Sequence, residues 1–198
     1  MNYNNFFYNK LINKKYKNNH QLVGWGSKKS QLIRFKQLIK QVDLNNKSLL
    51  DVGCGLADLK TFLSSKNIKT TYSGIDLNRV FISKCRKKFS NTQFILGDFL
   101  SIKFSRKYDV VVQSGMLNLP SDNQDSLLKK IITKMFKLSK KCCAVNFLTN
   151  KAKSINTNQV YINLNKQISF IEQITPFYFI NKSYMTHDVT IFLYHDKQ

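Results

Sequence analysis

The sequence lacks the two kinds of hydrophobic segment that would direct it into a membrane or out of the cell. No run of apolar residues approaches the roughly 18 that a membrane-spanning helix requires. Residues 1–19 also lack the apolar core and the cleavage site of a secretory signal peptide. We therefore expect a cytoplasmic protein, and 198 residues with 42% apolar side chains are enough for one domain with a substantial core.

The cysteines lack the spacing of a metal site or a disulfide framework. Cys54, Cys85, Cys142 and Cys143 form no CxxC pair, and no histidine stands at metal-ligand spacing from them. Cys142 and Cys143 lie in an apolar run, where cysteine usually acts as a small hydrophobic residue. We therefore expect neither a metal site nor disulfides.

Acidic residues are scarce, because 11 Asp and Glu stand against 32 Lys and Arg and leave a net charge of +21. One interpretation is nucleic-acid binding. The other is the bias of an AT-rich genome, whose codons favour Lys, Asn and Ile. The lysines are spread along every segment, whereas RNA-binding surfaces usually interleave arginines with aromatic residues. We favour the second interpretation and leave a nucleic-acid partner open.

Short apolar runs alternate with segments of helical period along most of the chain. Ser27 is a predicted N-cap, and Ser121 with Gln124 forms a predicted capping box. Strands are predicted at 48–52, 72–75, 94–96, 109–112 and 142–148, and helices at 28–42, 59–63, 80–89, 122–135 and 164–174. This alternation predicts a parallel sheet with helices on both faces.

The C-terminal part departs from this alternation. Residues 177–184 and 189–194 read as two strands joined by a very short connection. A connection that short cannot cross over between parallel strands, so the two strands must be antiparallel.

We divide the chain into an N-terminal helical cap or lid segment, 1–47, and an α/β domain, 48–198.

Glycines and carboxylates stand where three of the predicted strands end. Gly53 and Gly55 form a turn after the first strand and follow Asp51, while Asp76 ends the second strand and Asp98 follows the third. Glycines let the backbone approach a ligand closely, and a carboxylate at the second strand end can accept both hydroxyls of a ribose. The carboxyl ends of adjacent strands are where open α/β sheets bind ligands.

The order of these motifs makes the assignment more specific. Asp51-x-Gly53-x-Gly55, Gly74-Ile-Asp76, Gly97-Asp98 and Tyr108-Asp109-Val-Val resemble the motif series of class I S-adenosylmethionine-dependent methyltransferases. Segments such as Gly24-Trp25-Gly26-Ser27 are similar to short bacterial methyltransferases of unestablished substrate. The resemblance implies a Rossmann-like doubly wound seven-stranded sheet of order 3-2-1-4-5-7-6 with strand 7 antiparallel. A nicotinamide dinucleotide fits less well, because Asp58 occupies the place of its last small residue.

The resemblance also implies roles for individual residues toward S-adenosylmethionine. Asp51, Gly53, Cys54 and Gly55 would border its methionine part, Asp76 and Leu77 its ribose, Asp98 and Phe99 its adenine, and Gln113, Ser114 and Gly115 its methyl group. Arg34 would pair with its carboxylate; the alternative is an ordinary solvated arginine on a helix.

Methyl transfer from a sulfonium requires mainly in-line alignment of the acceptor and exclusion of water. A general base is needed only if the acceptor arrives protonated. His187, Tyr184 and His20 are the candidate bases, although a single histidine is more often structural.

The segment after the fourth strand bears on the acceptor. Residues 113–120 lack the Asn/Asp-Pro-Pro-aromatic tetrapeptide of enzymes that methylate exocyclic or amide nitrogens. We predict a methyltransferase for a small-molecule acceptor. The alternatives are an RNA methyltransferase and a non-catalytic protein that binds S-adenosylmethionine.

Overall fold

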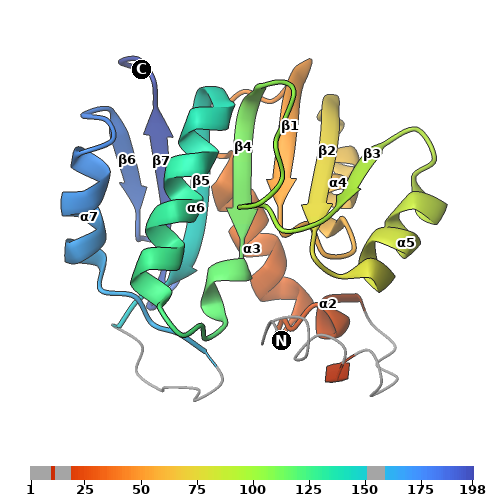
Figure 1. Ribbon diagram of the computed structural model, residues 1–198, viewed down its shortest axis with the longest axis horizontal. Coiled ribbons are helices and arrows are strands. Elements are labelled where there is room, and N and C mark those ends of the chain that lie inside the picture. Colours follow the sequence, from red (N-terminus) through yellow and green to blue (C-terminus); the bar gives the residue numbers. More distant parts are fainter. Residues whose placement is uncertain (1–9, 12–18, 151–158) are drawn as a thin grey trace.

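Seven strands form one mixed sheet in the order β3-β2-β1-β4-β5-β7-β6 (Figure 1). The computed structural model describes residues 10–11, 19–150 and 159–198. The strands are β1 (Lys47–Val52), β2 (Thr70–Asp76), β3 (Gln93–Leu96), β4 (Tyr108–Ser114), β5 (Ser139–Leu148), β6 (Tyr178–Asn181) and β7 (Asp188–Tyr194). The predicted strand order is confirmed.

Helices cover both faces of the sheet. They are α2 (Asn19–Leu22), α3 (Lys28–Ile39), α4 (Asp58–Ser65), α5 (Arg79–Lys88), α6 (Gln124–Leu138) and α7 (Leu164–Glu172), with a 3-10 turn η1 (Met116–Asn118). Among the described helices, none combines the length and the hydropathy that crossing a bilayer demands.

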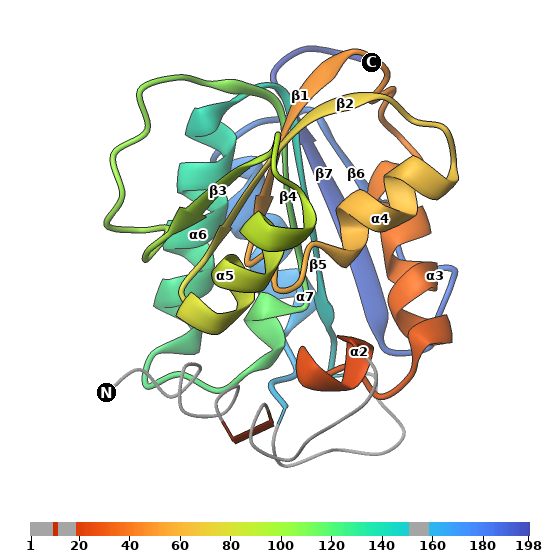
Figure 2. The same ribbon diagram turned by 90° about the vertical axis from the view of Figure 1, so that its right-hand side faces the viewer.

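Successive residues of the central strands pack against different helices. Leu49 and Val110 share a core with side chains of α3, α4 and α5, whereas Leu50 and Val111 share one with α6 and α7. Figure 2 shows α6 on one side of the sheet and α3 with α4 on the other. Successive side chains of a strand point to opposite faces of the sheet. Because both faces are covered by helices, the central strands are apolar at nearly every position.

The direction of β7 brings a distant part of the chain to the functional edge of the sheet. β7 is antiparallel to β5 and pairs Asp188 with Leu148, the last residue of β5. The first residue of β7 therefore lies at the edge where β1, β2, β4 and β5 end. The predicted antiparallel hairpin of β6 and β7 is confirmed.

The helix boundaries confirm one predicted cap and correct another. The Ser27 hydroxyl accepts the backbone N–H of Ser30 at 3.1 Å and caps α3. For α6 the predicted cap was wrong, because Asn123 accepts from Ser126 N–H while Ser121 binds the Gln124 side chain. Asn123 stands one residue before the helix, where a capping side chain reaches the free N–H groups.

The segment before β1 contributes to the same core as the sheet. Phe35 and Leu38 of α3 pack with Leu49, Leu59 and Val110. Residues 1–9 and 12–18, which belong to the predicted lid, lie outside the described part of the chain. The division at residue 47 stays a prediction.

Candidate active site

A cavity of about 870 Å³ lies at the carboxyl edge of the sheet. Each neighbouring strand contributes a residue at or just past its end: Gly53 after β1, Asp76 of β2, Ser114 of β4 and Leu148 of β5. His187, directly before the antiparallel β7, completes this edge. The cavity therefore occupies the place where open α/β sheets bind ligands.

The glycine turn after β1 is fixed by hydrogen bonds to β2. The N–H groups of Gly53 and Cys54 donate to the Ile75 carbonyl at 2.8 and 3.0 Å, and Gly55 N–H donates to Asp76 Oδ2 at 2.8 Å. Gly53 and Gly55 have φ values of +71° and +53°, which residues with a Cβ adopt only at a cost. The turn needs glycine at both positions.

Asp76 retains capacity to bind a ligand. Its two carboxylate oxygens accept backbone N–H groups of Gly55 and Asn78, each at 2.8 Å. Burial raises the pKa of Asp76, while the backbone N–H groups of Asn78, Gly55 and Leu77 lower it. A carboxylate has four lone pairs, so at least one can still accept a hydrogen bond from a ligand in the cavity.

Asp51 is a buried carboxyl at the inner wall of the cavity. It is 4% exposed and accepts the Tyr72 hydroxyl at 2.6 Å. Burial raises the pKa of Asp51 to about 7, although the Tyr72 hydrogen bond favours its ionised form. Such a group ionises readily when a cation arrives beside it.

The third strand end supplies an exposed carboxylate and a buried ring. Asp98 accepts Leu100 N–H at 2.9 Å and the Ser101 hydroxyl at 3.1 Å, and its side chain borders the cavity. Phe99 is buried at the cavity wall, and Leu77 lines the cavity as well. The structure thus gathers the residues predicted from the first three strand ends into one site.

Residues before α3 pack across the mouth of this site. A Cβ at Gly115 would stand 2.9 Å from the Trp25 ring, and a Cβ at Gly55 would stand 2.9 Å from the Val23 side chain. Asp58, the first residue of α4, holds this segment by accepting from Asn19 at 3.4 Å. Its other oxygen accepts from the Gln31 amide at 3.0 Å. Because they lack a Cβ, Gly115 and Gly55 leave room for the Trp25 and Val23 side chains.

Arg34 is the only lysine or arginine among the described residues that line the cavity. It is 6% exposed, so the alternative of a solvated helix arginine is wrong. Its Nε and Nη2 donate to the two oxygens of Asp188 at 2.5 and 2.8 Å. Its guanidinium also lies 4.9 Å from the centre of the Trp25 ring. These contacts leave the Nη1 edge without a partner among the described residues.

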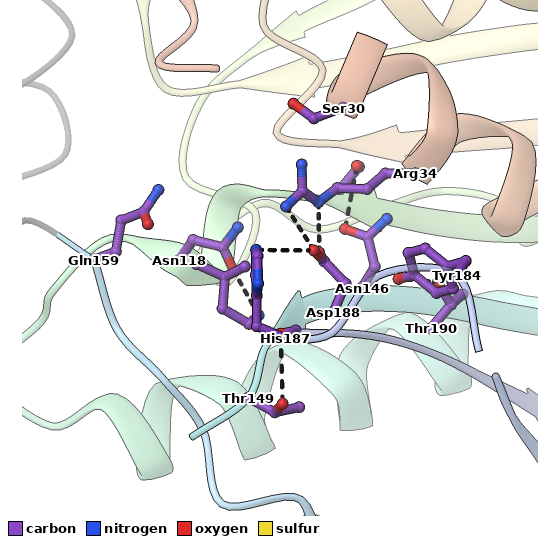
Figure 3. Close-up of polar contacts among 12 residues, drawn as sticks. Ser30, Arg34, Asn118, Asn146, Thr149, Gln159, Tyr184, His187, Asp188 and Thr190 are labelled. Atoms are coloured by element: carbon purple, nitrogen blue, oxygen red, sulfur yellow. Dashed lines mark hydrogen bonds and ion pairs between the residues drawn. The ribbon is translucent and has the colours of Figure 1, made fainter. Parts of the chain in front are cut away.

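His187 lines the cavity beside this ion pair (Figure 3). Its Nε2 is 3.5 Å from Asp188 Oδ2, an ion-pair distance. Its backbone carbonyl accepts Thr149 N–H at 2.7 Å. The His187 side chain is 37% exposed and therefore accessible from the cavity.

Three predicted residues are not brought to the cavity. Gln113 is fully buried, and its amide oxygen, turned toward η1, accepts Met116 N–H at 2.7 Å. The Tyr184 hydroxyl turns to Thr190 at 2.9 Å, and burial raises its pKa well above the ordinary value. His20 lies in α2 and does not line the cavity.

Sequence reasoning also missed residues that the structure places here. Asp188 and Asp58 were not singled out as parts of the site, and Asn118 and Met185 line the cavity as well. Asp58 could have been found, because a carboxylate in the first turn of a helix is a common anchor for N–H donors. No local pattern marks the other three.

The strand order and the position of the cavity confirm the class that the motifs predicted, a class I S-adenosylmethionine-dependent methyltransferase. The family follows from comparison with known sequences. The chain belongs to the methyltransferase-domain family, whose family model matches residues 43–178.

Similar proteins within this class act on very different molecules, as their names state. Ribosomal RNA small subunit methyltransferase A of Mesomycoplasma hyopneumoniae (strain 232) is 30% identical over 105 residues, covering 53% of this chain and 39% of the relative. Fatty-acid O-methyltransferase of Mycolicibacterium smegmatis is 33% identical over 75 residues, covering 36% and 27%. The chain thus spans well under two thirds of either curated relative.

One solved structure shows the likeness of fold over the whole chain. Magnesium protoporphyrin IX methyltransferase from Synechocystis PCC 6803, with bound S-adenosylmethionine, superposes with a TM-score of 0.65. The match covers 98% of this chain and 93% of the other at 15% identity. At that identity the comparison defines the fold and leaves the acceptor open.

Proposed function

We propose that this protein transfers a methyl group from S-adenosylmethionine to a small-molecule acceptor in the cytoplasm. The observation that carries the proposal is one continuous cavity, which the strand ends of β1 and β2, Trp25 and His187 all line. Its volume of about 870 Å³ lies within the range of about 300–1,000 Å³ typical of small-molecule sites. Because this volume must also hold the cofactor, the space that remains favours a compact acceptor over a folded nucleic acid.

The residues at the first three strand ends fit the cofactor. Asp76 has spare acceptor capacity for the ribose hydroxyls, and Asp98 with Phe99 offers a carboxylate and a ring to the adenine. Asp51 faces the place of the cationic amino group, and the free Nη1 edge of Arg34 can receive the carboxylate. When bound, S-adenosylmethionine supplies an electrophilic methyl group.

The contribution of the chain is then alignment and exclusion of water. Ser114 ends β4 and Gly115 follows it; both line the cavity, and Trp25 packs directly on Gly115. Fixing the acceptor in line with the methyl group makes the reaction effectively unimolecular. The cover provided by Trp25 limits the access of competing water.

Asp76→Asn tests the cofactor site. We expect the affinity for S-adenosylhomocysteine to fall by about tenfold or more, because a hydrogen bond to a charged acceptor contributes about 1.5–3 kcal/mol. Asp196→Asn, at an exposed position near the C-terminus, is the matched control and should bind like the unmodified protein. Isothermal titration measures both, and equal affinities for the two variants would contradict the assignment of Asp76.

RNA is the second candidate acceptor, because the net charge is +21 and one relative is named as a ribosomal RNA methyltransferase. A non-catalytic role is weaker, since packing alone requires no carboxylates at three strand ends. Incubation with methyl-labelled S-adenosylmethionine, once with an ultrafiltered metabolite extract and once with total RNA, separates the candidates. We expect label in the metabolites and RNA binding that falls steeply with salt. Label at one RNA position, with binding that survives raised salt, would refute the small-molecule acceptor.

A further inference from the structure

We propose that His187, oriented by Asp188, takes the proton of a hydroxyl acceptor, so that the protein is an O-methyltransferase. This inference rests on the proposed function and deepens it, because it assigns the class of acceptor and the group that activates it. Its starting point is the cluster of Arg34, Asp188 and His187 at the end of the cavity away from β2 and β3 (Figure 3).

Asp188 contacts both of the other residues in this cluster. Its side chain has no exposed surface, and both of its oxygens are held by Arg34. Oδ2 also faces His187 Nε2 at 3.5 Å. The guanidinium compensates the buried charge of Asp188, and the carboxylate still presents a lone pair to the imidazole.

This arrangement selects one ring nitrogen of His187 as the base. The carboxylate charge 3.5 Å away favours a proton on Nε2, which would place the lone pair of the neutral ring on Nδ1. No described residue forms a hydrogen bond with Nδ1. The 3.5 Å between His187 Nε2 and Asp188 Oδ2 is long for a hydrogen bond. Contacts of this kind often shorten when the acceptor binds.

The backbone around His187 is fixed while its side chain remains accessible. Thr149 N–H holds the His187 carbonyl at 2.7 Å, and Asp188 starts β7 in register with Leu148. Tyr184, in the same loop, turns its hydroxyl away to Thr190. The charged groups that face His187 among the described residues are therefore Asp188 and, behind it, Arg34. A fixed backbone with a side chain on the cavity is the geometry that a general base requires.

The surroundings favour a hydroxyl over other acceptor groups. An ionised carboxylate or thiolate acceptor needs no base. A carboxylate acceptor would also need a cation, but Asp188 holds one edge of Arg34 and the proposed function gives the other edge to the cofactor. An ammonium would need an unpaired carboxylate, but Asp188 is already paired. A hydroxyl carries its proton at neutral pH and needs a base, a role that histidine commonly fills in enzymes. Leu119, Leu148 and Met185 offer an apolar wall for the body of the acceptor.

The atoms balance without any further reactant. The acceptor O–H bond breaks and its proton goes to His187 Nδ1, while the oxygen forms the new bond to the methyl carbon. The carbon–sulfur bond of the sulfonium breaks and its electron pair stays on sulfur. The products are a methyl ether, S-adenosylhomocysteine and a protonated His187, which releases its proton to solvent.

Two probe acceptors of the same shape test the inference. Phenol carries its proton at neutral pH and needs a base, whereas thiophenol is largely ionised and does not. We expect the unmodified protein to methylate both probes, and His187→Gln to lower the phenol-to-thiophenol rate ratio by about 100-fold, the lower end of general-base catalysis. His195→Gln is the matched control, because His195 stacks on Phe136 away from the cavity, and its ratio should not change.

Asp188→Asn tests the positioning role separately, at a temperature at which circular dichroism shows the variant folded. The rate ratio should fall here too, although His187 is intact; if the variant does not fold, His187→Gln decides alone. An unchanged ratio in His187→Gln, or an unmodified protein that methylates thiophenol only or neither probe, would overturn the inference. Failure to bind S-adenosylhomocysteine in titration would instead overturn the proposed function, so the two failures are distinguishable.

Discussion

Asp188→Ala is expected to lower the free energy of unfolding by about 3–5 kcal/mol. The reason is that Arg34 would remain buried at 6% exposure with neither of its two carboxylate hydrogen bonds. Urea unfolding followed by circular dichroism measures the change. Lys140→Ala is the matched control for an exposed pair, because Lys140 lies 3.9 Å from Asp109 with a side chain that is 55% exposed. Its loss should cost about 0–1 kcal/mol.

The double variant Arg34→Met/Asp188→Leu separates burial of a single charge from loss of the pair. We expect it to recover most of the lost stability, since replacing both members of a buried pair by apolar side chains is often close to neutral. The same variant should also have a lower phenol-to-thiophenol rate ratio, because His187 would have no carboxylate beside it. A single variant as stable as the unmodified protein would show that the pair does not support the fold.

The sequence was sufficient to predict the sheet and half of the site. The period of the apolar residues defined the strands, and the resemblance supplied their order. Parallel strands end at one edge, so the placement of Gly53, Asp76 and Asp98 in one cavity follows from the strand assignment alone. This is why the proposed cofactor half of the site was accessible from sequence.

The proposed acceptor half was not accessible from sequence, because its central contact joins residues that are 154 positions apart. Arg34 lies on a helix before β1, and Asp188 opens the antiparallel strand near the C-terminus. The sequence singled out Arg34 as a partner of the cofactor carboxylate but did not mark Asp188. Their meeting depends on the packing of α3 against the sheet. The sequence identified His187 as a candidate base but could not show the carboxylate that lies 3.5 Å from its Nε2.

Gln113 illustrates a different failure. Its position at the end of β4 predicted a place beside the methyl group, but the turn at Gly115 leaves the first N–H groups of η1 without partners. The Gln113 amide oxygen can serve them, at 2.7 Å from Met116 N and 3.1 Å from Gly115 N. The Gln113 side chain therefore turns toward η1, because buried backbone N–H groups need a hydrogen-bond acceptor.

Asp51→Asn is expected to stabilise the protein at pH 8 and to have little effect near pH 4. The folded pKa of Asp51 is about 7, and its ordinary value is 3.8. Between these values the folded state holds a proton that the unfolded state has lost, so stability from this group falls as pH rises from about 4 to 7. Above pH 7 the ionised carboxyl is buried at a cost of up to about 4 kcal/mol, at 1.36 kcal/mol per unit of pKa.

The gain in stability should be accompanied by a loss of cofactor binding. Asparagine can still accept the Tyr72 hydroxyl, so the fold is retained, but it cannot ionise beside the cationic amino group of the cofactor. Urea unfolding at pH 5 and pH 8, together with titration of S-adenosylhomocysteine, checks both effects. A stability difference that is the same at both pH values would contradict burial of the ionised carboxyl. A more stable variant that binds as tightly as the unmodified protein would remove Asp51 from the cofactor site, because a buried ionised carboxylate would then serve no ligand.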